Sequence, residues 1–387
     1  MKKTTFFKTM LLLCALVVGS GNLWAGIDVT ATLTGSALAT AAADGYTNHT
    51  TPLIDDKGNQ YVGNWYNAQK SKVWYNTIQL GAISASNTSH VTLPKYDGKI
   101  KTITLSVTSS SGTSEEQSGK EAKVIMNIVN GSAYTKSDIS SNGILSVDHS
   151  TDDTKSFEVS FDFTTLGTDY DGEGLYICSS SGSLRIWEMV VVYEVTTVPA
   201  KFAAGKTMIS YSKPFALDFT DVNRPDGLKA YKVSAADNTS VTLTEVTSTV
   251  AANTGLILTG SANTDYPINA VASGTNISET NKLVATDGTS TVSDAAVVSA
   301  GEFHPLTSGV IAAGKAYLPY ANIEGGDPFA GGARALDIVF KDDVVTGITS
   351  IEKSPVTLGN FYDLQGRKVA QPKKGLYIVN GKKVIIK

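Results

Sequence analysis

Strict alternation of apolar and polar residues is the feature that most constrains what this chain can fold into. Residues 157–163 read FEVSFDF, so every second side chain is apolar, and residues 103–107 read ITLSV with the same period. A period of two is that of a β-strand with one buried face. The stretches between such segments are rich in Ser and Gly, and only residues 37–43 could form a short helical turn. The pattern predicts an all-β protein built from sandwiches.

The first predicted unit covers residues 26–196. We expect a jelly-roll-like β-sandwich here, closed by a long strand over residues 184–195. Period two along that strand turns Trp187 and Met189 to the same face. The long closing strand loosely resembles that of galactose-binding-like carbohydrate modules. This resemblance implies a non-catalytic, sugar-binding jelly roll.

The second predicted unit is a β-sandwich over residues 200–341. Pro199 marks a short linker at 196–200, and residues 342–357 form a second linker before the tail. The unit is rich in Thr, Ser, Ala and Val, which favour strands and short polar turns. Its predicted strands include 215–219, 241–243, 256–258 and 336–340.

The first 25 residues have the pattern of a secretory signal peptide. Lysines lie at positions 2, 3 and 8, an apolar run covers residues 10–18, and small residues lead to a predicted cut after Ala25. The apolar run is too short to anchor the chain in a bilayer. We therefore expect an exported protein with no transmembrane segment once the signal peptide is removed.

Residues 358–387 predict a small C-terminal β-sandwich made of two hairpins. Asn380-Gly381 is the pair that most readily forms a tight type I′ turn, and Gln365-Gly366 is a weaker version of it. The residues that carry the pattern are Tyr362, Asp363, Leu364, Gly366, Arg367, Gly375, Tyr377, Gly381 and Lys387.

This tail resembles the C-terminal sorting domain of type IX secretion cargo. The resemblance implies export through the periplasm of a Gram-negative bacterium and across the outer membrane by its secretion machinery. It further implies removal of the domain, followed by release or attachment at the cell surface. The alternative is that the tail is the last hairpin pair of the body.

Charge is unevenly placed along the chain. The net charge is −4, the signal peptide contributes three lysines, and the tail from residue 361 holds seven basic residues against one acidic residue. Residues 26–360 therefore carry −13. An acidic body argues against nucleic acid as a partner.

An aromatic cluster suggests a glycan or another surface ligand. It comprises Tyr61, Trp65, Tyr66, Trp74 and Tyr75, with Asn and Gln side chains beside them. Exposed rings stack on the CH faces of sugars, while amides bond hydroxyl groups. Alternation predicts that Trp74 lies in the core, whereas the Gly- and Asn-containing stretch predicts a loop around Trp65 and Tyr66. Ordinary packing of all these rings is the alternative.

Acidic loops suggest a structural calcium, with no other cofactor expected. Asp169, Asp171 and Glu173 supply the hard oxygen ligands that calcium takes, without full EF-hand spacing. A second such loop spans 148–153. A solvated turn is the alternative.

The sequence offers little for catalysis. Its four histidines are far apart and in no metalloprotease pattern, and there is no GxSxG elbow. Glu173 with Glu188, or Asp162, could form the carboxylate pair of a jelly-roll glycosidase. Cys178 is expected to be a buried core residue. We therefore expect a non-catalytic binding protein, with a structural or adhesive surface protein as the alternative.

Overall fold

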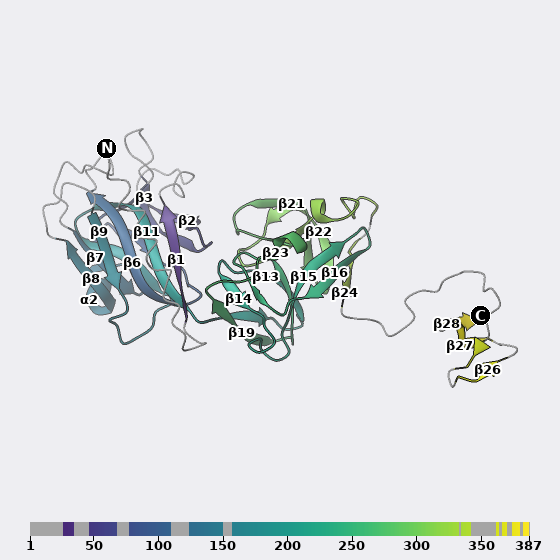
Figure 1. Ribbon diagram of the computed structural model, residues 1–387. Helices are drawn as coiled ribbons and strands as arrows, with labels where there is room; N and C mark the ends of the chain where they lie inside the picture. The colour runs from purple at the N-terminus through teal and green to yellow at the C-terminus, as the bar shows by residue number, and fades with distance from the viewer. Residues whose placement is uncertain are drawn as a thin grey trace, which may run out of the picture.

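Figure 1 shows the computed structural model, which is nearly all β. The residues that it describes are 26–34, 46–67, 77–109, 124–149, 157–332, 334–341, 361–363, 366–369, 374–379 and 382–386. The predicted signal peptide at 1–25 and the predicted linker at 342–357 lie outside this set. No helix among these residues is long and apolar enough to cross a membrane.

The first unit is an antiparallel sheet that folds into a jelly-roll-like sandwich (Figure 1). Its strand order is β8-β7-β10-β5-β3-β4-β11-β6-β9, with β1 on β11 and β2 on β3. The bounds are β1 Ile27–Thr34, β2 Tyr46–Ile54, β3 Gln60–Asn67, β4 Ile78–Leu80, β5 His90–Thr92, β6 Lys99–Ser109, β7 Val124–Asn130, β8 Gly143–His149, β9 Phe157–Asp162, β10 Leu175–Ser181 and β11 Leu184–Val195.

The sheet forks into two layers at the short strand β4. One edge of β11 pairs first with β4 and then, beyond Trp187, with β1. One edge of β3 likewise pairs first with β5 and then with β4. The layers β1-β11-β6-β9 and β2-β3-β5-β10-β7-β8 therefore meet at β4 and enclose one core. Val159 and Phe161 lie in this core, which confirms the predicted alternation.

A β-bulge in β11 corrects one prediction. The register with β6 shifts between Ile186 and Glu188, so Trp187 falls in the irregularity. Ile186 and Met189 are buried in the core, whereas Trp187 is only half-buried. An extra residue in one strand reverses the facing of the residues after it. The expectation that Trp187 shares the face of Met189 is therefore wrong.

One short helix, α2 (Lys136–Asn142), was not predicted. Thr135 caps its N-terminus by accepting a hydrogen bond from the Asp138 amide at 3.1 Å. Thr135-x-x-Asp138 is the sequence pattern of a capped helix start, so the signal was present.

The second unit contains three sheets. Their orders are β12-β19-β14-β17, β13-β18-β15-β16-β24 and β20-β23-β21-β22. The bounds are β12 Thr197–Phe202, β13 Met208–Tyr211, β14 Ala216–Asp218, β15 Lys229–Ala236, β16 Ser240–Glu245, β17 Thr249–Val250, β18 Leu256–Thr259, β19 Thr264–Val271, β20 Val284–Ala285, β21 Thr291–Ser299, β22 Glu302–Val310, β23 Ala316–Pro319 and β24 Asp337–Phe340, with 3₁₀ turns at Ser278–Thr280 and Tyr320–Asn322.

The middle sheet separates two cores. Leu256 and Leu258 of β18 pack into the core that includes the first unit, whereas Ile257 between them packs into a second core. A strand buried on both faces reads as a continuous apolar run. The predicted strand at 256–258 is confirmed, and its lack of alternation follows from this position.

The expected linker at 196–200 is wrong. Residues Thr197–Phe202 form β12, which pairs antiparallel with β19. Val198 and Phe202 are buried, and Pro199 points away from the core. Because β12 is an edge strand, it tolerates a proline that cannot donate to the ladder. Thr196 alone separates β11 from β12.

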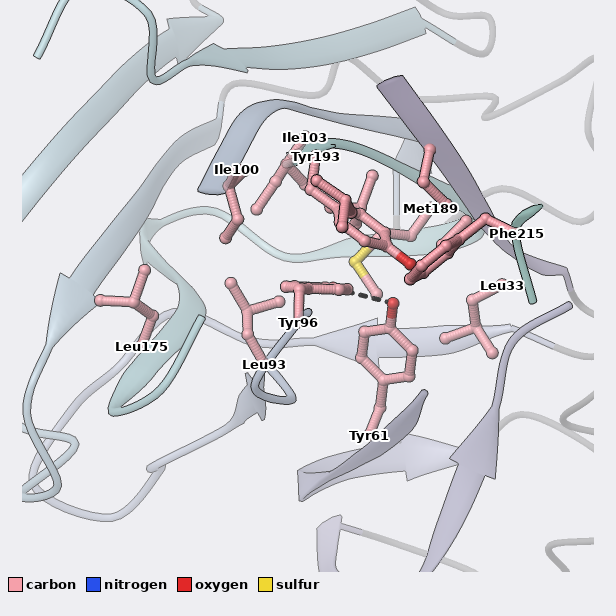
Figure 2. Close-up of a cluster of buried hydrophobic side chains, with 14 of the residues drawn as sticks. Leu33, Tyr61, Leu93, Tyr96, Ile100, Ile103, Leu175, Met189, Tyr193 and Phe215 are labelled. Atoms are coloured by element: carbon pink, nitrogen blue, oxygen red, sulfur yellow. Dashed lines mark hydrogen bonds between the residues drawn. The ribbon is translucent and has the colours of Figure 1, made fainter. Parts of the chain in front are cut away.

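The two units share a core where they meet (Figure 2). Phe215 of the second unit packs with Leu33 and Tyr193 of the first, and the Phe215 side chain is 6% exposed. Lys213 Nζ forms an ion pair with Asp97 Oδ2 across the junction at 2.7 Å. The two units are therefore packed together rather than joined by a flexible linker.

The tail pairs as the sequence predicts. Strands β25 (Phe361–Tyr362), β26 (Lys368–Val369), β27 (Gly375–Val379) and β28 (Lys382–Ile386) form two hairpins. The hairpins join through β25 and β27 into one four-stranded sheet, a single layer where two were expected. Asp363 accepts hydrogen bonds from Arg367 N and Nε at 2.8 and 2.7 Å. Leu364, Gly381 and Lys387 lie outside the described residues.

Candidate functional site

Two rings of the predicted ligand-binding cluster are core residues. Trp65 and Tyr61 both have 0% of their surface exposed, and both lie in β3 rather than in a loop. They point inward because residues an even number apart share one face of a strand, and this face of β3 packs into the core. The expectation that they form an exposed platform is wrong. Tyr66 lies in β3 opposite Gln79, but its side chain, like all of Trp74 and Tyr75, is outside the described residues.

Tyr61 belongs to a buried polar network. Its hydroxyl lies 2.9 Å from the Asp55 carboxylate. It also lies 2.9 Å from the Tyr96 hydroxyl, as Figure 2 shows. Asp55 also accepts from the Asn59 backbone and side-chain nitrogens, each at 2.9 Å. Burial raises the pKa of both Tyr61 and Tyr96. Satisfied networks of this kind hold a core in one arrangement, which is a structural role.

The predicted calcium ligands are paired with lysines. Lys95 Nζ contacts Glu173 and lies 3.3 Å from Asp171 Oδ2, and Lys99 Nζ is 3.9 Å from Asp169 Oδ2. Within the described part of the chain, no group of three or more His, Cys, Asp or Glu side chains is placed to hold a metal ion. The calcium at this loop remains a prediction.

The candidate catalytic carboxylates also have local partners. Glu173 is engaged by Lys95. Asp162 accepts from the Thr164 amide at 2.9 Å and from its hydroxyl at 2.6 Å, and these bonds lower its pKa. Such bonds are typical of an aspartate that stabilises a turn.

A row of polar residues crosses four adjacent strands on the outer face of the sandwich. Asn64 of β3 lies opposite His90 of β5, His90 lies opposite Cys178 of β10, and Cys178 lies opposite Asn127 of β7. Side chains at opposite positions of antiparallel strands share a face, with Cβ atoms about 5 Å apart. Their strand neighbours Val91 and Ile177 point into the core. We name these four residues the polar row.

His90 is the centre of the polar row and is 5% exposed. Its Nδ1 lies 2.7 Å from the Thr88 carbonyl oxygen. A carbonyl can only accept, so Nδ1 carries the proton and Nε2 is an acceptor in the neutral ring. Burial lowers the pKa of His90, which favours the neutral ring. The Tyr134 ring stacks on it, with centroids 3.6 Å apart and planes 7° apart.

Residues 131–142, which we name the covering segment, lie over the polar row. Tyr134 and Ile139 of this segment pack against Tyr176 and Cys178. Asp138 holds the covering segment against β10. Its carboxylate accepts a hydrogen bond from the Tyr176 hydroxyl of β10 at 2.8 Å and another from the Tyr134 amide at 3.2 Å. Burial opposes ionisation of Asp138, but these hydrogen bonds prevail and lower its pKa.

Cys178 is a buried thiol, as the sequence suggests. None of its surface is exposed, and burial raises its pKa to about 12. A thiol needs a lowered pKa to act as a nucleophile near neutral pH. Its place in the polar row is therefore one of packing.

A second group of polar residues lies on the outer face of the other layer. Arg185 of β11 lies opposite both Gln79 of β4 and Thr108 of β6. Arg185 Nε donates to Gln79 Oε1 at 3.3 Å, and Trp187 Nε1 donates to Thr108 Oγ1 at 3.1 Å. Arg185 is 4% exposed, which is rare for a charged residue. Its burial was not predicted, although a lone arginine within the run LRIW is a visible signal.

Comparisons with known proteins add little. No model of a known protein family matches this chain, and no curated protein matches it. Among solved structures, it is similar to the cowpea mosaic virus top component, a naturally occurring empty particle, at 11% identity and a TM-score of 0.18. It is similar to broad bean stain virus at 8% identity and the same TM-score. Each likeness covers 71% of this chain and 95% of the other. These TM-scores are too low to bear on fold or function.

Proposed function

We propose that this chain is an exported, non-catalytic binding protein whose first unit binds a glycan. The observation that carries the proposal is the polar row, which places the Asn64 amide beside the His90 imidazole, and the His90 ring in contact with the ring of Tyr176. Sugars are recognised by rings that stack on their CH faces and by nearby groups that bond their hydroxyls.

Delivery to the cell surface is the second part of the proposal. The protein is cargo, and its tail is the sorting domain that the outer-membrane secretion machinery recognises, as the resemblance of the tail to type IX sorting domains implies. The paired hairpins and the Asp363–Arg367 contact support it, because a sorting domain must present a defined shape to its receptor. Deleting residues 361–387 should leave the protein in the periplasm. Normal surface display of that truncated chain would refute this part.

A structural or adhesive surface protein is the second candidate. The continuous core around Phe215 favours it, because two units that share a core transmit force without bending at a linker. In this function the ligand is a protein, and edge strands or flat faces rather than the polar row would carry the contact.

Binding to a polysaccharide panel tests the first candidate. We would measure polysaccharide binding by residues 26–387 with affinity electrophoresis and calorimetry. His90→Ala should abolish binding, and His304→Ala is the matched control because His304 lies on β22 of the second unit. Trp65→Ala would be uninformative, since Trp65 is a core residue. No binding to any polysaccharide, by this protein or by a variant that lacks the Tyr134 ring, would refute the glycan function and favour the adhesive one.

A further inference from the structure

The backbone of Tyr134 is held in an unfavourable conformation. Its φ is 53°, in the left-handed region that bulky side chains rarely adopt. The other described non-glycine residues with positive φ are Asn253, Asn263, Asp294 and Ala300, so Tyr134 is the one aromatic residue among them. Strain of this kind persists only where surrounding contacts hold it, and it gathers at functional sites.

The contacts that hold Tyr134 form a slot for its ring. The His90 ring forms one flat wall, stacked at 3.6 Å. The Tyr176 ring forms a second wall at 4.9 Å, with planes 72° apart. The Tyr134 ring therefore occupies a place that would accept another ring of similar size, with its face on His90.

An unpartnered acceptor lies beside this slot. Asn64 Oδ1 is buried and has no hydrogen-bond partner, and Asn64 is the neighbour of His90 in the polar row. Buried polar atoms in proteins are nearly always bonded, so an exception calls for a donor that arrives from outside. A sugar hydroxyl is such a donor, whereas the Tyr134 ring face is not.

We propose that the slot whose two walls are the touching rings of His90 and Tyr176 is a subsite for one sugar ring, and that Tyr134 fills it in the free protein. The inference rests on the proposed glycan function. It adds where on the first unit the glycan binds and how Tyr134 limits that binding. When the ligand binds, Tyr134 leaves the slot and its backbone leaves the strained conformation. The sugar ring then lies on the face of His90, and one of its hydroxyls donates to Asn64 Oδ1. Self-occupancy lowers the affinity, because only the open fraction of the protein can bind.

Tyr134→Gly tests the self-occupancy. Glycine accepts a φ of 53° without strain, so the substitution removes the ring while it preserves the local backbone. If about a tenth of the wild-type protein is open, the variant should bind the polysaccharide about tenfold more tightly. Tyr134→Phe, which keeps the ring, is the matched control and should bind like the wild type.

Asn64→Ala tests the subsite independently of the covering segment. Because Asn64 Oδ1 has no partner in the free protein, its removal should leave the thermal midpoint unchanged or raise it. The lost hydrogen bond to the sugar should weaken binding by roughly tenfold. A lower thermal midpoint would show that Asn64 has a structural role instead.

Labelling of Cys178 reports the opening of the slot without any glycan. Cys178 is the one cysteine beyond position 25 and lies next to His90 in the polar row. Tyr134→Gly should react with a small thiol reagent faster than the wild type, and the bound polysaccharide should slow that reaction. If the wild type binds but Tyr134→Gly and Asn64→Ala bind equally well, the subsite is refuted and the glycan function stands. If neither the wild type nor Tyr134→Gly binds any polysaccharide, both the subsite and the glycan function are refuted.

Discussion

The shared core predicts that removing one ring from the second unit will destabilise the first. Phe215 is 6% exposed and packs against Leu33, Met189 and Tyr193, which belong to the first unit (Figure 2). Truncation of a buried Phe to Ala costs about 3 kcal/mol or more, because a cavity replaces the lost contacts. Phe215→Ala should therefore lower the free energy of unfolding of the first unit by about that amount.

Tryptophan fluorescence makes this effect specific to the first unit. The tryptophans beyond position 25 are Trp65, Trp74 and Trp187, which all precede the second unit. With a urea m-value of about 3 kcal/mol/M, the fluorescence midpoint should fall by roughly 1 M. Far-UV circular dichroism should give the same midpoint in the wild type if the units unfold together.

A surface substitution in the second unit is the control. Val222 is 92% exposed, so Val222→Ala should leave the fluorescence midpoint unchanged. An unchanged fluorescence midpoint in Phe215→Ala as well would refute the reasoning, since it would mean that the two units unfold independently despite their common core.

Two further substitutions probe other contacts. Asp138→Asn should lower the free energy of unfolding by about 2 kcal/mol, because a neutral amide cannot accept all the bonds of the carboxylate. The pKa of Asp138 is lowered in the folded state, so its contribution is present above the unfolded pKa and lost as the pH falls through the folded pKa. The variant should therefore lose less stability than the wild type between about pH 5 and about pH 2, measured by thermal melts; parallel curves would contradict the role of Asp138. Gly172→Ala should destabilise by about 3 kcal/mol in urea titrations, because φ is +93° and an added Cβ would lie 2.1 Å from the Pro94 carbonyl oxygen. A near-neutral effect would mean that this loop relaxes freely.

The misplacement of Trp65 shows where local pattern misleads. Glycine and asparagine around it suggest a loop, yet Tyr61 and Trp65 are four residues apart and so share one face of a strand. Gly63 lies between them because a Cβ there would be 2.4 Å from the His90 carbonyl oxygen. The glycine therefore marks a close approach of two strands, not a turn.

The linker prediction at 196–200 failed for a related reason. A proline taken in isolation suggests a break in structure, but an edge strand tolerates it. Whether Pro199 lies on an edge depends on where β12 pairs, and its partner β19 is more than sixty residues away in the chain.

The sequence by itself determined that this chain is all β, that period two runs through strands such as 157–163, and that its tail forms two hairpins. These are local properties, because the facing of a side chain in a strand depends on its immediate neighbours. Only the tertiary structure decided that Asn64, His90, Asn127 and Cys178 form one row, and that Tyr134 covers it. Those positions are separated by tens of residues, and strand order and register bring them together. Pairing between distant strands is set by the packing of the whole core, which no local pattern encodes.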